Sequence, residues 1–158
     1  MIPAQELLGK RETVFTYHED GVTRCWAVQR ILADIESGVL SGELIPALLV
    51  ANTGRTLLNK GGLGYQRIFS IMENPARLHQ PGVLMYPDTM NDRNPLIVDG
   101  RHRYVALCML GHDRSVNPFM SFHTFTESDL APYEVEMETS FTAEQAEIWA
   151  SHVSQHRV

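Results

Sequence analysis

The chain has 158 residues, of which 44% are hydrophobic and 20% charged, so it can bury an ordinary core and is not expected to be disordered. Its formal net charge of −6 argues against non-specific nucleic-acid binding by the whole surface. The apolar runs are too short for a membrane span, the first residues lack the apolar core of a signal peptide, and the two cysteines fit a reducing compartment. We therefore expect a single cytoplasmic α/β domain with appended elements.

Residues 1–43 are expected to form a strand and helix extension. Residues 13–17 have strand composition, and Glu19-Asp20-Gly21 is a turn signal. The following VTRCWAV could be the return strand of a hairpin, but it also begins an apolar stripe at helical spacing. We favour a helix over residues 22–37, ended by Gly38. The stripe consists of Cys25, Val28, Ile31, Leu32 and Ile35.

Residues 44–125 are expected to form the core, in the order strand, helix, strand, strand, helix, strand. Pro46 indicates that the first strand is at an edge or begins there, and Asn74-Pro75 should end the first helix because a residue before proline avoids the α region. The predicted elements are strand 44–51, helix 64–73, strand 83–86, strand 96–98, helix 101–110 and strand 117–125. Cys108 falls on the expected buried face of the second helix.

The segment RTLLNKGGLG, residues 55–64, is rich in glycine but lacks the spacing and the final Gly-Lys-Ser/Thr of a phosphate-binding P-loop. We interpret it as a connector or lid. Arg55 and Lys60 are its candidate ligand contacts.

The sequence PLIVDGRHRYVALCMLG, residues 95–111, joins a short apolar strand to a helix through a turn at Asp99-Gly100. Arg101, His102 and Arg103 then open the helix. Backbone amides and the helix dipole at such a terminus attract anions, and two guanidiniums and an imidazole strengthen that attraction. The corner is therefore a candidate phosphate site.

The same residues also have a purely structural interpretation, in which one arginine pairs with Asp99 and His102 caps the helix. Adjacent helical residues diverge by about 100°, so not all three side chains can face one ligand. We expect His102 and one arginine to do so.

The string Asp99-Gly100-Arg101-His102-Arg103, between a strand and a helix, resembles the central motif of the ParB/sulfiredoxin-like superfamily. The expected order of elements over residues 44–125 matches the core of that superfamily. The resemblance implies a small mixed sheet with packed helices. It also implies that a nucleotide, ATP, ADP or CTP, lies with its phosphates over this corner, often with Mg²⁺. Phosphotransfer or nucleotide hydrolysis is then the expected reaction.

In that scheme Gly100, Arg101, His102, Arg103 and Arg55 would bind the nucleotide. Asp99 would orient His102 or hold Mg²⁺, and its alternative role is the turn itself. A phosphotransfer also needs a carboxylate base for the acceptor hydroxyl, for which Glu43 and Glu73 are the candidates. For a lone glutamate, solvation at the surface is the common alternative.

Two functions found in this superfamily, and a zinc site, are disfavoured. Sulfiredoxins carry a reactive cysteine immediately before the His-Arg pair, where this chain has Arg101. Partition proteins add a DNA-binding domain and a dimerisation tail, for which we expect no room in 158 residues. His102, His112 and His123 lack the paired spacing of a zinc site.

Residues 126–158 are expected to form an acidic segment and a final helix. Thr142 and Gln145 fit a capping box, and Trp149 should anchor the helix. The span from Glu127 to Glu147 holds seven acidic residues and no lysine or arginine, which leaves open a non-catalytic accessory protein of phage or plasmid type that binds a basic host partner. Nucleic-acid binding through the corner arginines is a third hypothesis. The acidic residues are Glu127, Asp129, Glu134, Glu136, Glu138, Glu144 and Glu147.

Overall fold

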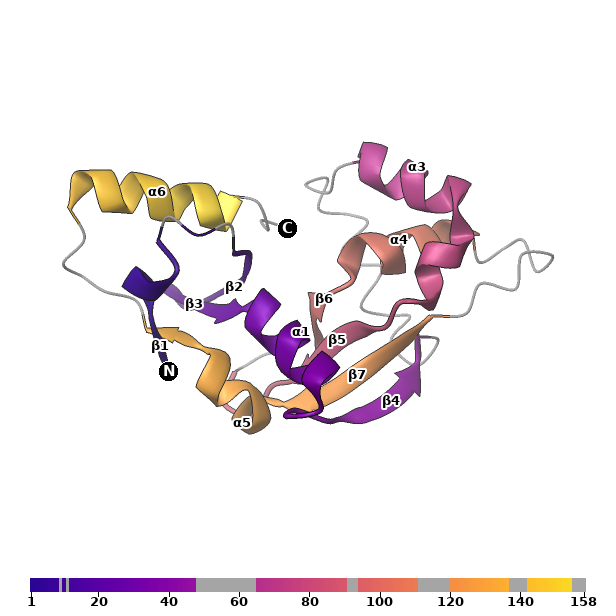
Figure 1. The fold of residues 1–158 in the computed structure, drawn as a ribbon, viewed down its shortest axis with the longest axis horizontal. Coiled ribbons are helices and arrows are strands. Elements are labelled where there is room, and N and C mark those ends of the chain that lie inside the picture. Colours follow the sequence, from indigo (N-terminus) through magenta and orange to yellow (C-terminus); the bar gives the residue numbers. More distant parts are fainter. Residues whose placement is uncertain are drawn as a thin grey trace. The chain divides into compact units, whose positions relative to one another are not determined.

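The computed structural model describes residues 1–8, 10, 12–47, 65–90, 94–110, 120–136 and 142–154. Within them the chain is a mixed α/β protein with small sheets. It divides into two compact units (Figure 1). The first unit consists of Met1–Ser41, Thr89–Asn91 and Glu127–Arg157, and the second mainly of Gly42–Asp88 and Asp92–Thr126.

The second unit is built on a four-stranded mixed sheet. Its strands are β4 (Glu43–Pro46), β5 (Gly82–Tyr86), β6 (Leu96–Asp99) and β7 (Ser121–Thr126). They lie in the order β4-β7-β5-β6, with β5 parallel to β7 and the two outer pairs antiparallel. This arrangement puts β4 and β6 at opposite edges.

One face of this sheet is covered by α3 (Tyr65–Glu73), the 3₁₀ helix η3 (Pro75–His79) and α4 (Arg101–Leu110). Alternation along the strands turns Leu84, Ile97 and Phe122 toward the helices. Their burial against apolar helix residues is the main hydrophobic stabilisation of the unit. The helix side of this core comprises Ile68, Ile71, Leu78, Tyr104, Val105, Ala106 and Leu107.

The predicted order of strands and helices is confirmed from Glu43 to Thr126. The helix that ends before Asn74-Pro75 also ends there in the structure. The described part of the first predicted strand is β4, and residues 48–51 lie outside the described residues, as do residues 117–119 of the last one. Cys108 is half-buried rather than fully buried, because it lies at the margin of the helix–sheet core.

The first unit contains a hairpin of β2 (Val14–Glu19) and β3 (Val22–Ala27), followed by α1 (Val28–Ser37). The turn between the strands has positive φ at Asp20 (50°) and Gly21 (77°), as a tight two-residue hairpin requires. The prediction of a helix is therefore wrong for residues 22–27, whereas residues 28–37 form a helix and Gly38 ends it as predicted. Six residues of VTRCWA pair with β2 instead, because cross-strand hydrogen bonds outweigh the local helical spacing.

The C-terminal part of the chain returns to this unit. A short helix α5 (Glu127–Leu130), the 3₁₀ helix η4 (Ala131–Tyr133) and β8 (Val135–Glu136) follow β7. Strand β8 runs parallel to β1 (Ile2–Pro3), which precedes the 3₁₀ helix η1 (Ala4–Glu6). An isolated bridge between Trp26 and Glu134 joins this pair to the hairpin.

The last helix, α6 (Ala143–Ser154), has the predicted capping box. The Thr142 amide donates to Gln145 Oε1 at 3.0 Å, and the Gln145 amide donates to Thr142 Oγ1 at 3.2 Å. Trp149 is 6% exposed and packs in a core with residues of β1, β2, β3 and β8, as expected of the anchor. No described helix is long and apolar enough to cross a membrane.

Candidate functional site

The strand-to-helix corner predicted at residues 99–103 is present in the structure. Strand β6 ends at Asp99, Gly100 has φ 97°, and α4 begins at Arg101. The Tyr104 amide donates to the Gly100 carbonyl at 2.9 Å, which closes the first turn of α4. The amides of residues 101–103 precede that bond, in the part of a helix where backbone donors commonly meet anions.

Gly100 is required at this corner for two reasons. Its φ lies in the region that side-chain-bearing residues rarely adopt. A Cβ there would also stand 3.1 Å from Met120 Cε, 3.2 Å from Arg103 Nη2 and 3.2 Å from Gly82 Cα. The corner is therefore closely packed on the side that faces β5.

Arg103 forms an ion pair with Asp99. Its Nη2 donates to Asp99 Oδ2 at 3.2 Å and to the Pro81 carbonyl at 3.3 Å, and the two side chains are 15% and 20% exposed. The buried Arg103 Nε has no hydrogen-bond partner among the described residues. The pairing is the one that the structural interpretation of the motif foresaw, and it ties the first turn of α4 to the start of β5.

Arg101 is a buried cation, only 5% exposed. Burial lowers the pKa of its guanidinium to about 10, and the attraction of Asp99 opposes this only in part. The group stays protonated at neutral pH. A second negative charge beside it would therefore be stabilising.

His102, which stands between these two arginines in the sequence, is half-buried. Arg101 is buried, whereas His102 and Arg103 are both half-buried, and Arg103 is held by Asp99. The formal charge of the corner is positive, because two guanidiniums face one carboxylate. An anion is thus the ligand that its electrostatics favour.

The structure does not bring Glu43, one of the two candidate bases, to this corner. Glu43 is exposed at the start of β4, and its carbonyl accepts a hydrogen bond from Thr124 Oγ1 at 2.8 Å. Since β7 and β5 lie between β4 and β6, Glu43 is three strand spacings, about 14 Å, from the Asp99 strand. Glu73 is exposed at the last residue of α3.

Other predicted contacts cannot be placed. Arg55, Lys60 and His112 lie outside the described residues. Among the residues that the structure does describe, no three histidine, cysteine or carboxylate side chains gather as a metal site. Asp99 is the carboxylate of the corner itself, so Mg²⁺ could take one protein ligand there, with phosphate and water oxygens as the others.

The acidic segment is partly used inside the first unit. Glu127 is buried and Glu134 is half-buried, and both bind Arg24. Glu138 lies outside the described residues. The acidic residues of this segment that are exposed in the described part of the chain are Asp129, Glu136, Glu144 and Glu147.

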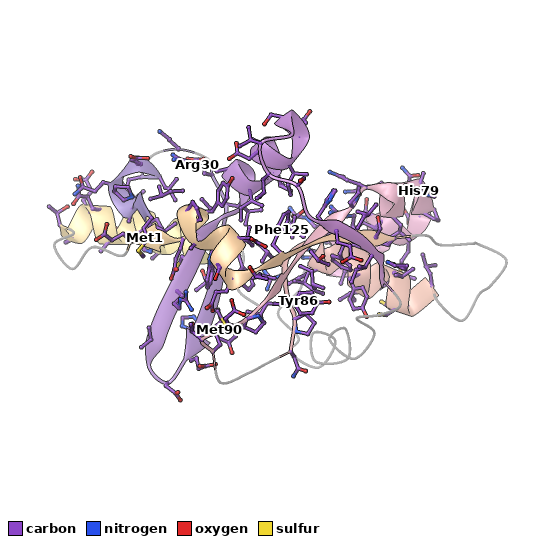
Figure 2. The ribbon with its side chains drawn as sticks, turned by 90° about the horizontal axis from the view of Figure 1, so that it is seen from below. Met1, Arg30, His79, Tyr86, Met90 and Phe125 are labelled. Atoms are coloured by element: carbon purple, nitrogen blue, oxygen red, sulfur yellow. The ribbon has the colours of Figure 1, made fainter. Side chains whose placement is uncertain are left out.

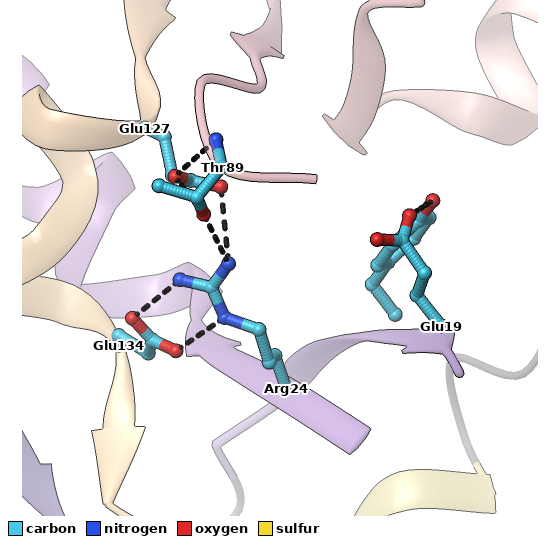
Figure 3. Close-up of polar contacts among 6 residues, drawn as sticks. Glu19, Arg24, Thr89, Glu127 and Glu134 are labelled. Atoms are coloured by element: carbon cyan, nitrogen blue, oxygen red, sulfur yellow. Dashed lines mark hydrogen bonds and ion pairs between the residues drawn. The ribbon is translucent and has the colours of Figure 1, made fainter. Parts of the chain in front are cut away.

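A polar cluster centred on Arg24, which the sequence did not predict, lies in the first unit (Figure 3). Its guanidinium binds Glu134 through Nε and Nη2, at 2.7 and 2.9 Å, and Glu127 through Nη1 at 3.0 Å. It also lies 4.9 Å from the centre of the Trp26 ring. The strand interpretation of VTRCWAV would have put Arg24 and Trp26 on one face, whereas the helical one separated them.

Comparison with protein-family models, with curated proteins and with solved structures finds no match for this chain.

Proposed function

We propose that this chain binds a nucleotide through its phosphates at the Asp99–Arg103 corner and carries out phosphotransfer or nucleotide hydrolysis there, in the manner of ParB/sulfiredoxin-like proteins. The observation that carries the proposal is the buried Arg101 guanidinium at the first residue of α4, next to the positive-φ Gly100. A helix N-terminus that carries two guanidiniums and one carboxylate favours an anion, and a phosphate accepts charge-assisted hydrogen bonds from such groups.

Two further features support this proposal. The strand–helix–strand–strand–helix–strand order is that of the superfamily core which the motif resembles. The corner is positively charged on a chain whose net charge is −6, so a small anion would be drawn to this place rather than to the surface at large.

Each residue of the corner then has a distinct role. The buried Arg101 guanidinium neutralises part of the phosphate charge. The amides that open α4 donate to phosphate oxygens, and His102 contacts the terminal phosphoryl group. Arg103 exchanges its bond with Asp99 for one with the phosphate. In the reaction, the bond from the terminal phosphorus to the leaving diphosphate oxygen breaks, and a bond to an acceptor hydroxyl or water oxygen forms.

Mg²⁺ would neutralise the β- and γ-phosphate oxygens when bound. Asp99 is the residue that would hold it, because Arg103 releases one of its oxygens on pairing with phosphate. Where Asp99 does not hold Mg²⁺, it is a better candidate than Glu43 for accepting the proton of the acceptor, because it lies at the corner and Glu43 lies three strands away.

The proposal is tested by calorimetric titration with ATP, ADP, CTP and inorganic tripolyphosphate, each with and without Mg²⁺. We expect saturable binding by the wild type, with tripolyphosphate competing. His102→Ala and Arg103→Gln should each weaken binding at least tenfold, which corresponds to loss of one charge-assisted contact.

Arg77→Gln is the matched control, because Arg77 is an exposed arginine in the same unit whose Nη1 contacts Ser70 Oγ at 3.3 Å. It should leave binding unchanged. An equal loss in Arg77→Gln would indicate non-specific attraction, and no heat with any nucleotide at millimolar concentration would overturn the proposal. In that event a basic protein partner for the exposed acidic residues becomes the better hypothesis.

A further inference from the structure

Thr89 and Met90 lie in the connection between β5 and β6 and belong to the first unit. We call residues 89–90 the strap. Tyr86, the last residue of β5, is 40% exposed, whereas Met90 is 3% exposed. Figure 2 labels both residues.

The strap is anchored on the carboxylate of Glu127. The Thr89 amide donates to Glu127 Oε2 at 3.1 Å, and the Thr89 hydroxyl donates to the same oxygen at 2.6 Å (Figure 3). The other oxygen, Oε1, accepts from Arg24 Nη1 at 3.0 Å. Each carboxylate oxygen therefore has its own donors, and the group can bind the strap and Arg24 together.

Arg24 alone does not compensate both carboxylates of the cluster, so Glu127 also needs the hydrogen bonds that the strap donates. Arg24 from β3 faces two carboxylates, and its two-point pairing with Glu134 takes up Nε and Nη2. Glu127, with a side chain 7% exposed, is left with one bond from Nη1. A buried carboxylate with so little compensation is unfavourable, and the two Thr89 donors supply the rest.

The direction of the Glu127 pKa agrees with this account. Burial alone would raise it, but hydrogen bonds from Thr89 and Arg24 and the charge of Arg24 outweigh burial, so the pKa lies below its ordinary value. The carboxylate is thus ionised whenever the pH is near neutral.

We propose that the Arg24–Glu127–Thr89 contacts form a releasable anchor for the strap, so that loss of the Glu127 charge detaches residues 89–90 locally while the hairpin of the first unit stays folded. The dependence is reciprocal: the carboxylate holds the strap, and the strap compensates the carboxylate. The inference is independent of nucleotide binding at the corner.

The test is amide hydrogen exchange of the full chain, resolved by residue with nuclear magnetic resonance, in wild type and in Glu127→Gln. We expect the Thr89 amide to exchange at least tenfold faster in the variant, while the amides of β2 and β3 keep their wild-type rates. Glu136→Gln is the matched control, since Glu136 is an exposed glutamate of β8, and it should leave Thr89 unchanged.

Unchanged exchange at Thr89 in Glu127→Gln would overturn the anchor. Equal acceleration at Thr89 and throughout the hairpin would overturn its local character. Should Glu127→Gln fail to fold, Thr89→Val removes the hydroxyl and keeps the amide. In that variant the titration of Glu127, followed by carboxyl-carbon resonance, should move to higher pH, and an unmoved titration would count against the proposal.

Discussion

Arg103 and Asp99 pair across the first turn of α4, with Nη2 of the arginine 3.2 Å from Oδ2 of the aspartate. The same nitrogen reaches the Pro81 carbonyl at 3.3 Å, so one side chain joins the end of β6, the start of α4 and the approach to β5. The pair holds the corner together.

Removing either partner of this pair should have unequal effects. Asp99→Asn loses the ionic part of one contact, for which we expect about 0.5–1 kcal/mol of destabilisation because both side chains are partly exposed. Arg103→Ala loses the Pro81 bond and the packing of the alkyl chain as well, so it should cost about 2 kcal/mol. Urea unfolding measures both, and an equal cost would show that neither the Pro81 bond nor the packing of the alkyl chain contributes.

The corner glycine gives a test of packing. Gly100→Ala should destabilise by about 2–3 kcal/mol, because it combines an unfavourable φ of 97° with contacts near 3.2 Å to Arg103, Met120 and Gly82. Gly38→Ala is the matched control: its φ is 82°, but nothing lies within 4 Å of the added Cβ. It should cost about 1 kcal/mol, and the difference between the variants measures the crowding. Equal losses would assign the whole effect to the backbone.

The sequence predicts the second unit better than the first, for physical reasons. In the second unit each element has a strong local signal, such as Asn74-Pro75 after α3 and Asp99-Gly100 before α4, and the predicted order agrees with the structure. The first unit depends on pairings between distant residues. Strands β1 and β8 contain two residues each and pair across the whole chain, so neither has a periodicity to detect.

The segment VTRCWAV shows why local patterns can mislead. Cys25 fits the apolar stripe that continues through α1, yet it lies in β3, where its Sγ is 3.6 Å from Thr16 Oγ1. The sequence marks the turn at Asp20-Gly21, but the helical spacing of the residues after it favours a helix over the paired return strand that the turn begins. The anchoring role of Thr89 had no sequence signal, since it arises from where Glu127 lies in space.

Tyr133 supplies a pH dependence. Its hydroxyl donates to Asp34 Oδ2, joining η4 to α1, and burial together with this aspartate raises the pKa of the phenol to about 12. A raised pKa favours the protonated phenol in the folded state, so its contribution is complete below the ordinary value near 10 and is lost as the pH rises toward 12. We expect the wild type to lose more stability than Tyr133→Phe between these pH values.

Chemical denaturation of both proteins at several alkaline pH values measures this difference. Parallel loss of stability in wild type and Tyr133→Phe would contradict the assignment. Phenolate absorbance offers a second measurement, because the wild-type titration minus that of Tyr133→Phe should have its midpoint near 12.

The contribution of the last helix can be isolated with neighbouring residues of α6. Trp149 is 6% exposed and packs with Val14, Cys25 and Val135, so Trp149→Ala should remove a large buried side chain at a cost of about 3–5 kcal/mol. Ile148, the preceding residue, is 38% exposed, and Ile148→Ala should change the free energy of unfolding by less than about 0.5 kcal/mol. Trp149→Ala removes a buried side chain and Ile148→Ala an exposed one from the same helix. The difference between their free energies of unfolding therefore reports the packing of α6 on the first unit rather than helix propensity. Similar values for the two variants would mean that α6 adds little to the stability of the first unit.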